Sequence, residues 1–193
     1  MRDYRLCAPL LLSALVLTGC SAQADQASAE TANSTIRATQ VQATFATGSG
    51  TAITYAPDLV PVGATAEVTS TSGDGKATVT LELSGLLPDR RYGAHAHTNR
   101  CGAAPADAGA HFQHVKDPAA PSVDPAYANP QNEIWLDFQT DAEGKATATS
   151  TVAWEFTDQA HPRSVVVHAE RTATEPGKAG TAGDRAACVS VDF

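Results

Sequence analysis

From about residue 41 onward, short runs of alternating apolar and polar residues recur along the chain, interrupted by Gly, Pro and Asp. ATAEVTSTS and KATVTLELSGL flank the tripeptide GDG, which is the pattern of a β-hairpin with a tight turn. KATATSTVAWEF, RSVVVHAE and ACVSVDF predict further strands. No segment of ten or more residues carries the apolar period of a helix. The pattern therefore predicts an all-β sandwich or flattened barrel with Greek-key connections.

Two regions do not alternate, Thr98–Gln131 and Arg171–Arg185. The first contains five Pro together with His111 and His114, and the second is rich in Gly, Thr and Ala. Loops of this length inside a compact domain are usually functional. We therefore expect the chemistry of the protein to lie in these two loops.

The first residues have the features of an export signal. Arg2 and Arg5 precede an apolar run, Leu6–Leu17, that is too short to span a bilayer in the ordinary way. The run ends in LTGC, which resembles the lipobox of bacterial lipoproteins with Cys20 as the lipidated residue; the alternative is a plain signal peptide with an incidental cysteine. We expect residues 1–20 to be a lipoprotein signal peptide, 21–40 a flexible tether and 41–193 the folded domain. The domain would then be extracytoplasmic and attached to the bacterial cell membrane only through this lipid.

Processing would leave two of the four cysteines, Cys101 and Cys188, available to the folded domain. Two cysteines in an exported domain suggest one disulfide, and the alternative is a pair of free buried thiols. The formal net charge of −8 argues against a nucleic-acid partner, because binding phosphates needs clustered Lys and Arg. The few basic residues of this chain are scattered along it.

The segment RYGAHAHT places two of the six histidines one residue apart. Alternate side chains of a strand share a face, so His95 and His97 would project the same way and could reach one ion. Taken alone, this spacing is also common for surface histidines. His111 and His168, which lie near the two loops, complete a possible all-imidazole site. Such a site suits copper or zinc, and copper alone would add redox chemistry.

Four segments, GAHAHTNRCG, AGAHFQH, SVVVHAE and AGTAGDRAACVSVDF, occur in the order of the motifs of the copper/zinc superoxide dismutases. The chain resembles this family from about Ala43 to Phe193. The resemblance implies a Greek-key β-sandwich with two long functional loops, one copper per subunit and superoxide as substrate. His95, His97 and His168 match copper ligands, and His111 matches the imidazolate that bridges copper and zinc. Cys101 and Cys188 match the intrasubunit disulfide, and Arg185 matches the arginine that guides the anion.

The zinc half of the resemblance is incomplete. After the bridging histidine the family supplies two more histidines and an aspartate, whereas this chain offers His114 and, nearest the aspartate position, Glu133. A zinc site made of His111, His114 and carboxylates is chemically allowed. The alternative is a copper-only member, in which a carboxylate such as Glu133 or Glu170 holds a ligand histidine by its other nitrogen.

Two functional hypotheses follow from these residues. The first is a superoxide dismutase with Arg185 and His111 as catalytic residues. The second is an extracytoplasmic module on the same fold that binds copper or zinc without useful turnover. The sequence leaves open whether the protein is a monomer or a homodimer.

Overall fold

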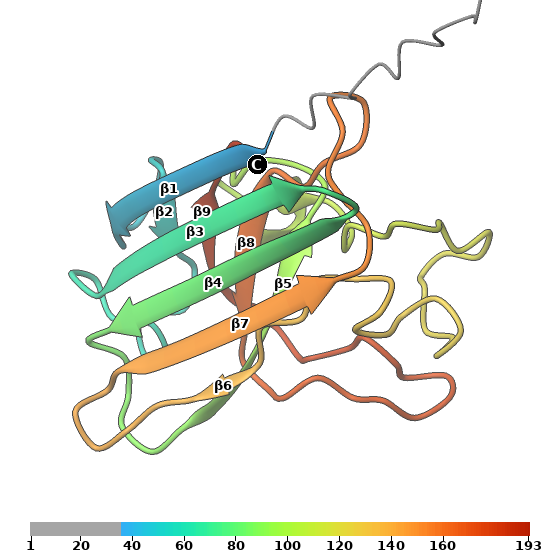
Figure 1. Ribbon diagram of the computed structural model, residues 1–193. Coiled ribbons are helices and arrows are strands. Elements are labelled where there is room, and N and C mark those ends of the chain that lie inside the picture. The colour runs from blue at the N-terminus through green and yellow to red at the C-terminus, as the bar shows by residue number, and fades with distance from the viewer. Residues whose placement is uncertain (1–35) are drawn as a thin grey trace, which may run out of the picture. The chain divides into compact units, whose positions relative to one another are not determined.

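The computed structural model describes residues 36–193, which form two antiparallel β-sheets packed face to face (Figure 1). The four-stranded sheet has the order β1-β3-β4-β7, and the five-stranded sheet has the order β2-β9-β8-β5-β6. Helical structure within these residues is limited to a short 3₁₀ turn, η1 (Pro105–Ala108). The strands are β1 (Arg37–Thr44), β2 (Ala52–Thr54), β3 (Thr65–Gly73), β4 (Lys76–Ser84), β5 (Arg91–His97), β6 (Phe138–Gln139), β7 (Ala146–Val152), β8 (Ser164–His168) and β9 (Arg185–Ser190). The predicted all-β sandwich is confirmed.

The predicted hairpin around GDG is the joint between β3 and β4. Asp74 and Gly75 both have positive φ, 54° and 75°, which is the requirement of a type I′ turn. The turn sets a register in which alternate residues, such as Val68 and Leu81, enter the core. The opposite face carries threonine, and Thr80 and Thr149 hydrogen-bond across the strands at 3.0 Å.

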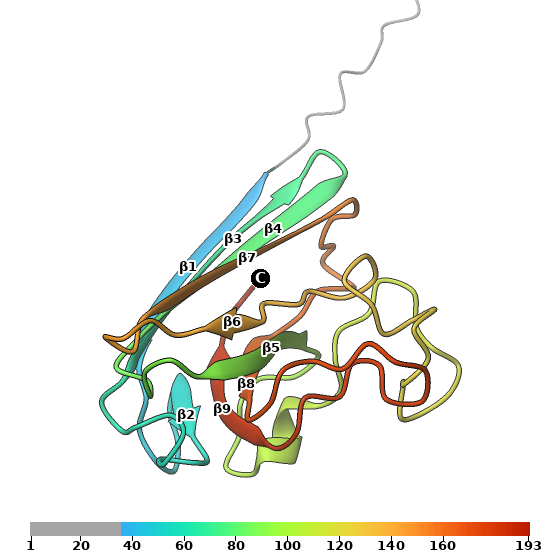
Figure 2. The same ribbon diagram turned by 90° about the horizontal axis from the view of Figure 1, so that it is seen from below.

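The five-stranded sheet is buried more completely than its partner. Every residue of β8 is buried, as is every residue of β5 after Arg91. The four-stranded sheet covers one face of this sheet, and the two long loops gather at one end of the sandwich (Figure 2). A polar side chain on β5 or β8 therefore needs a partner within the protein.

The core between the sheets is built largely from small side chains, with a few large aromatic residues. Ala66, Ala94 and Val165 are at most 4% exposed, and Tyr92 and Phe45 are fully buried. Tyr92 satisfies its hydroxyl by donating to Leu59 O at 2.7 Å. The small side chains keep the sheets close, and Phe112 of the first long loop also packs against this core.

The predicted boundary of the folded domain is wrong by four residues. We expected the tether to reach residue 40, but β1 begins at Arg37 and pairs with β3 from Ser72 onward. The segment reads as polar because β1 is an edge strand whose outer face meets solvent. Its Thr39 donates to Asp192 O at 2.7 Å, which ties β1 to the end of the chain. The predicted signal peptide, Cys20 and residues 21–35 lie outside the described residues.

The predicted disulfide between Cys101 and Cys188 is present and joins the first long loop to β9. Cross-linking residues 87 positions apart removes loop entropy from the unfolded chain.

Within residues 36–193 there is no helix that is both long and apolar enough to span a bilayer.

We expect a Cys101→Ser, Cys188→Ser double variant to unfold with about 4 to 5 kcal/mol less stability than the oxidised protein. Urea unfolding monitored by circular dichroism measures this difference. The reduced wild-type protein is the control and should resemble the variant. Equal midpoints for the oxidised and reduced proteins would contradict a structural role for the bond.

Candidate metal centre

His95 and His97 lie on β5 and point to the same side, as their spacing predicts. Both residues are fully buried. On one side of β5, β8 pairs with them; on the other, isolated bridges pair His95 with Trp135 and His97 with His111. The two imidazoles are therefore held between neighbouring strands with little freedom to turn away.

His168 joins them from the end of β8, where the pairing with β9 is irregular. The register shifts between Val167 and His168, and His168 is paired with Arg185. Residues opposite each other in an antiparallel pair project to the same face, and a bulge re-aims side chains at such a position. The irregularity therefore places a ligand histidine and a cation side by side.

His111 belongs to the first long loop, and backbone hydrogen bonds on either side of it position it beside β5. Phe112 N donates to Ala96 O at 2.9 Å, and Thr98 N donates to Ala110 O at 3.0 Å. These bonds bring the His111 ring within 4.1 Å of His95 and 4.8 Å of His97, measured between ring centroids. The four histidines predicted as one site are thus brought together: one ring nitrogen from each lies within 4.8 Å of all the others.

Hydrogen bonds on the outer side of each ring leave the inner nitrogens without protons. His97 Nδ1 lies 3.1 Å from Gly109 O, and His168 Nδ1 lies 3.4 Å from Gly183 O. A carbonyl can only accept, so Nδ1 is the protonated nitrogen in both rings and Nε2 carries the lone pair. The two Nε2 atoms lie 3.4 Å apart. Two lone pairs at that distance repel each other, and a cation bound between them would remove the repulsion.

His95 presents its other nitrogen to the same point. His95 Nε2 lies 2.7 Å from Thr172 Oγ1, and the Thr172 hydroxyl donates in turn to Asp137 Oδ1 at 2.6 Å. Because the hydroxyl proton is given to the carboxylate, Thr172 accepts from His95 Nε2–H. The remaining atom, His95 Nδ1, is buried and has no hydrogen-bond partner.

Burial keeps these rings neutral. Desolvation, followed by the nearby His111, lowers the pKa of His95 and of His97 well below the usual value of 6.5. The same two causes lower the pKa of His168 to about 3. Neutral imidazole is the form that ligates metal.

The centre fits a single transition-metal ion. Two nitrogens bound tetrahedrally at the usual metal–nitrogen distance lie roughly 3.3 Å apart, close to the separation of the His97 and His168 Nε2 atoms. The unpartnered Nδ1 of His95 is a further free donor aimed into the cluster. An all-imidazole donor set suits copper or zinc.

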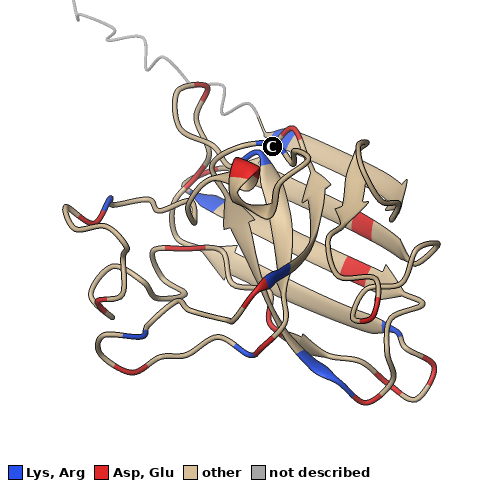
Figure 3. Ribbon diagram, turned by 180° about the vertical axis from the view of Figure 1, so that it is seen from behind, with Lys and Arg blue, Asp and Glu red and all other residues tan. Residues whose placement is uncertain are grey.

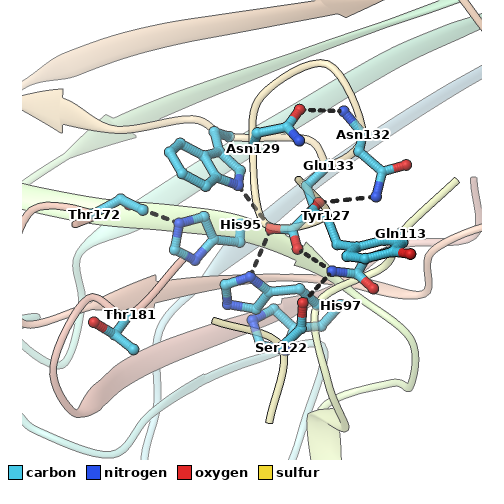
Figure 4. A network of polar contacts seen from close by, with 12 residues as sticks. His95, His97, Gln113, Ser122, Tyr127, Asn129, Asn132, Glu133, Thr172 and Thr181 are labelled. Carbon is cyan, nitrogen blue, oxygen red and sulfur yellow. Dashed lines mark hydrogen bonds and ion pairs between the residues drawn. The ribbon is translucent and has the colours of Figure 1, made fainter. Parts of the chain in front are cut away.

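Sequence reasoning missed Thr172 as a partner of the centre. Thr172 is 7% exposed and lies four residues after His168, at a position that no motif marks. Its backbone N donates to Asp137 Oδ2 at 2.9 Å, so the Asp137 carboxylate holds both the amide and the hydroxyl of Thr172. The contact with His95 is labelled in Figure 4. A partner supplied by loop folding leaves no periodic signal.

Glu133 holds the outer nitrogen of His111, one of the two alternatives that the sequence left open for this residue. Its side chain is 1% exposed, and Glu133 Oε2 accepts from His111 Nδ1 at 2.8 Å and from Trp135 Nε1 at 2.7 Å. The inner nitrogen of His111, Nε2, is therefore free for the shared ion. The other carboxylate considered, Glu170, is exposed, and its described contacts do not include a histidine.

The structure does not assemble the zinc site that combined His111, His114 and carboxylates. His114 is exposed, and its ring stacks on Trp154 at 4.9 Å and 6°. The nitrogen of His111 that would face a second ion is already bonded to Glu133. Among the described residues, the one group of side chains that could hold a metal is the four-histidine cluster. The residues present therefore do not fit zinc beside the first ion.

Arg185 lies in the cleft that leads to the centre, together with His111 and His168. Its Nη1 donates to Pro105 O at 2.7 Å, and its Nη2 donates to Gly109 O at 2.6 Å. Desolvation lowers the pKa of this guanidinium below its usual value. The two bonds occupy two of five N–H groups, so the fixed cation keeps donors for an anion in the cleft.

We expect Thr172→Val to weaken Cu(II) binding about 10- to 100-fold, because the substitution removes the bond that fixes the His95 tautomer. Competition with a chelator measures the affinity, and circular dichroism checks the fold. Thr174→Val, at an exposed position of the same loop, is the matched control. Equal affinities for the two variants would rule out a positioning role for Thr172.

Comparison with known proteins bears on the family and the fold of this chain. The sequence model of the family described as copper/zinc superoxide dismutase (SODC) matches residues 62–191. A search of curated proteins found no significant match. Among solved structures, Cu/Zn superoxide dismutase from Brucella abortus aligns with a TM-score of 0.52 at 20% identity, covering 79% of this chain and 99% of that one. A double mutant of a SOD-like protein from Bacillus subtilis aligns with a TM-score of 0.48 at 17% identity, covering 64% and 86%.

The structural likeness to the Brucella enzyme, at 20% identity, extends to the fold alone. The match over residues 62–191 includes all four clustered histidines, both disulfide cysteines and Arg185. This chain belongs to the copper/zinc superoxide dismutase family.

Proposed function

We propose that this protein is a copper-dependent superoxide dismutase that converts two superoxide anions and two protons into dioxygen and hydrogen peroxide. The observation that carries the proposal is the convergence of four imidazole nitrogens beside a fixed guanidinium at the end of an open cleft. A structural metal site would not need an anion-binding cation at its entrance.

His95 Nδ1 and the Nε2 atoms of His97, His111 and His168 would hold one copper ion per chain. When bound, copper supplies the redox step, taking an electron from one superoxide and returning it to the next. The chain itself holds each ring in the required tautomer through Thr172, Gly109, Glu133 and Gly183. Fixed rings lower the reorganisation needed between successive turnovers.

Arg185 would bind and orient the anion. The chain carries a formal charge of −8, so an approaching superoxide is repelled by most of the surface. In the ribbon of Figure 3, the segments that carry basic residues are scattered among those that carry acidic ones. A guanidinium that two carbonyls hold inside the cleft provides a local positive charge that attracts the anion.

His111 would move a proton. Its side chain is 19% exposed toward the cleft, unlike the fully buried His95 and His97. Glu133 holds the Nδ1 proton, so Nε2 is the atom that would take up a proton when it is not bound to the metal and pass that proton to the departing peroxide. The carboxylate stabilises the positive charge that the ring carries in between.

A second candidate function is capture of copper without useful turnover. The loss of the zinc site is the observation that favours it, because a family member specialised for binding needs only the four histidines. Purified full chain loaded with one equivalent of copper separates the two. Rapid superoxide removal supports the dismutase, and stoichiometric copper with negligible turnover supports capture.

We expect Arg185→Ala to lower kcat/KM for superoxide at least about tenfold while copper content stays at one per chain. The salt dependence of the rate should also weaken, since a steering charge is lost. Pulse radiolysis or stopped-flow at several ionic strengths measures both. Lys145→Ala, which changes the net charge equally but lies outside the cleft lining, is the control. The same rate for all three proteins would contradict guidance by Arg185.

We propose further that the domain is extracytoplasmic and attached to the bacterial cell membrane through a lipid on Cys20. The proposal rests on the LTGC sequence after an apolar run. Cys20→Ser should move the protein from the membrane fraction to the soluble fraction of the exporting cell, with unchanged folding. Membrane fractionation followed by immunoblotting tests this, and an unchanged distribution would exclude the lipid anchor.

A further inference from the structure

We infer that two amide side chains, Gln113 and Asn132, hold the loop of this chain in place without a second metal ion. Together with Glu133 they close the segment 111–133 by hydrogen bonds and orient His111 before any metal binds. Figure 4 draws these residues as one polar network beside His95 and His97. The inference concerns the loop itself and does not rest on the proposed dismutase activity.

Asn132 links two parts of the loop, one at Val115 and one at Tyr127. It is 9% exposed, its Oδ1 accepts from Val115 N at 2.7 Å, and its Nδ2 donates to Val115 O and to Tyr127 O, both at 2.8 Å. Both faces of the amide are therefore satisfied by backbone groups that lie 17 and 5 residues away. A single buried side chain thus cross-links the start and the end of the loop, as a coordinated ion would.

Gln113 connects the outer part of the loop to the centre. Its Nε2 donates to Ser122 Oγ at 2.9 Å and to Glu133 Oε1 at 2.8 Å, and its Oε1 accepts from Asp117 N at 2.9 Å. Ser122 Oγ donates in turn to Asp117 Oδ2 at 2.7 Å. The network runs without a break from the exposed turn near Asp117 to the carboxylate that holds His111.

Glu133 leaves no room for a second ion on this side of the centre. Its two oxygens accept from Gln113, His111 and Trp135, and the side chain is 1% exposed. The proton on His111 Nδ1 is used in one of these bonds. A zinc ion would have to displace that proton and break at least one of the bonds to a buried carboxylate.

The direction of the His111 ring is consequently set by the loop. Removing the Gln113 amide leaves Glu133 Oε1 without its donor, so only the bonds of Oε2 to His111 and Trp135 still orient the carboxylate. Residues that hold a ligand histidine by its outer nitrogen typically contribute 10- to 100-fold to metal affinity. Gln113 and Asn132 are positioning residues, since neither belongs to the four-histidine cluster that could hold the metal.

The test uses the full chain. In the metal-free protein we expect the amide protons of Val115 and Asp117 to be protected from hydrogen exchange, because their acceptors are the side chains of Asn132 and Gln113. Adding excess zinc to the copper-loaded protein should leave one metal per chain by elemental analysis and the melting temperature unchanged. Unprotected amides, or a second equivalent of metal that raises the melting temperature, would overturn the inference.

Variants separate positioning from general loosening of the fold. Gln113→Ala should lower copper affinity about 10- to 100-fold and change the Cu(II) electron paramagnetic resonance spectrum, with the β-rich circular dichroism retained. Asn132→Ala, which removes the acceptor of Val115 N as well as both amide donors, should loosen the loop at Val115 and Tyr127 and abolish protection at Val115. Gln131→Ala, at the exposed neighbour, is the control and should change none of these. Wild-type spectra and protection in both test variants would contradict the assignment.

Discussion

The fold is organised around four imidazole rings, each of which brings one nitrogen within 4.8 Å of the others. Each ring has its proton on the outer side, held by a carbonyl, a hydroxyl or a carboxylate, so the inner nitrogens have no donor left to satisfy them. Burying unsatisfied acceptors is costly, and burying them face to face adds repulsion. The rest of the sandwich supplies the energy that keeps the rings in this arrangement. A bound cation would convert the repulsion into coordination.

The two sheets contribute differently to this arrangement. The four-stranded sheet, which contains the β3–β4 hairpin, contributes apolar residues to the core and none of the four rings. The five-stranded sheet supplies three of the rings from β5 and β8, where backbone pairing fixes their positions. His111 alone comes from a loop, and it is the ring with the most exposure and the most elaborate support. Strand pairing thus holds the three rings of the sheet in place, and hydrogen bonds hold the His111 ring, which lines the cleft.

The sequence was sufficient for the parts of the protein that follow a local period. Alternation predicts β3, β4 and β7 closely, the apolar run SVVV predicts β8, and the HxH spacing places His95 and His97 on one face. The short strand β2 and the polar edge strand β1 were not predicted, because alternate positions of their sequences differ little in polarity. The roles of Thr172 and Asn132 were not predicted for a different reason, since each side chain reaches its partners only after a long loop has folded. His114 was misplaced in the zinc set because its stacking on Trp154 depends on a residue 40 positions away.

The carbonyl of Gly109 contacts both Arg185, the cation of the cleft, and His97, one of the four clustered histidines. Gly109 O accepts from Arg185 Nη2 at 2.6 Å and from His97 Nδ1 at 3.1 Å. Gly109 has a φ of 73°, a conformation that other residues adopt only with strain. The segment that presents this carbonyl begins at Cys101, whose disulfide ties it to β9 three residues beyond Arg185. The covalent bond therefore acts on the centre at a distance, because loosening it would release the anchor of the guanidinium and the outer partner of His97 together.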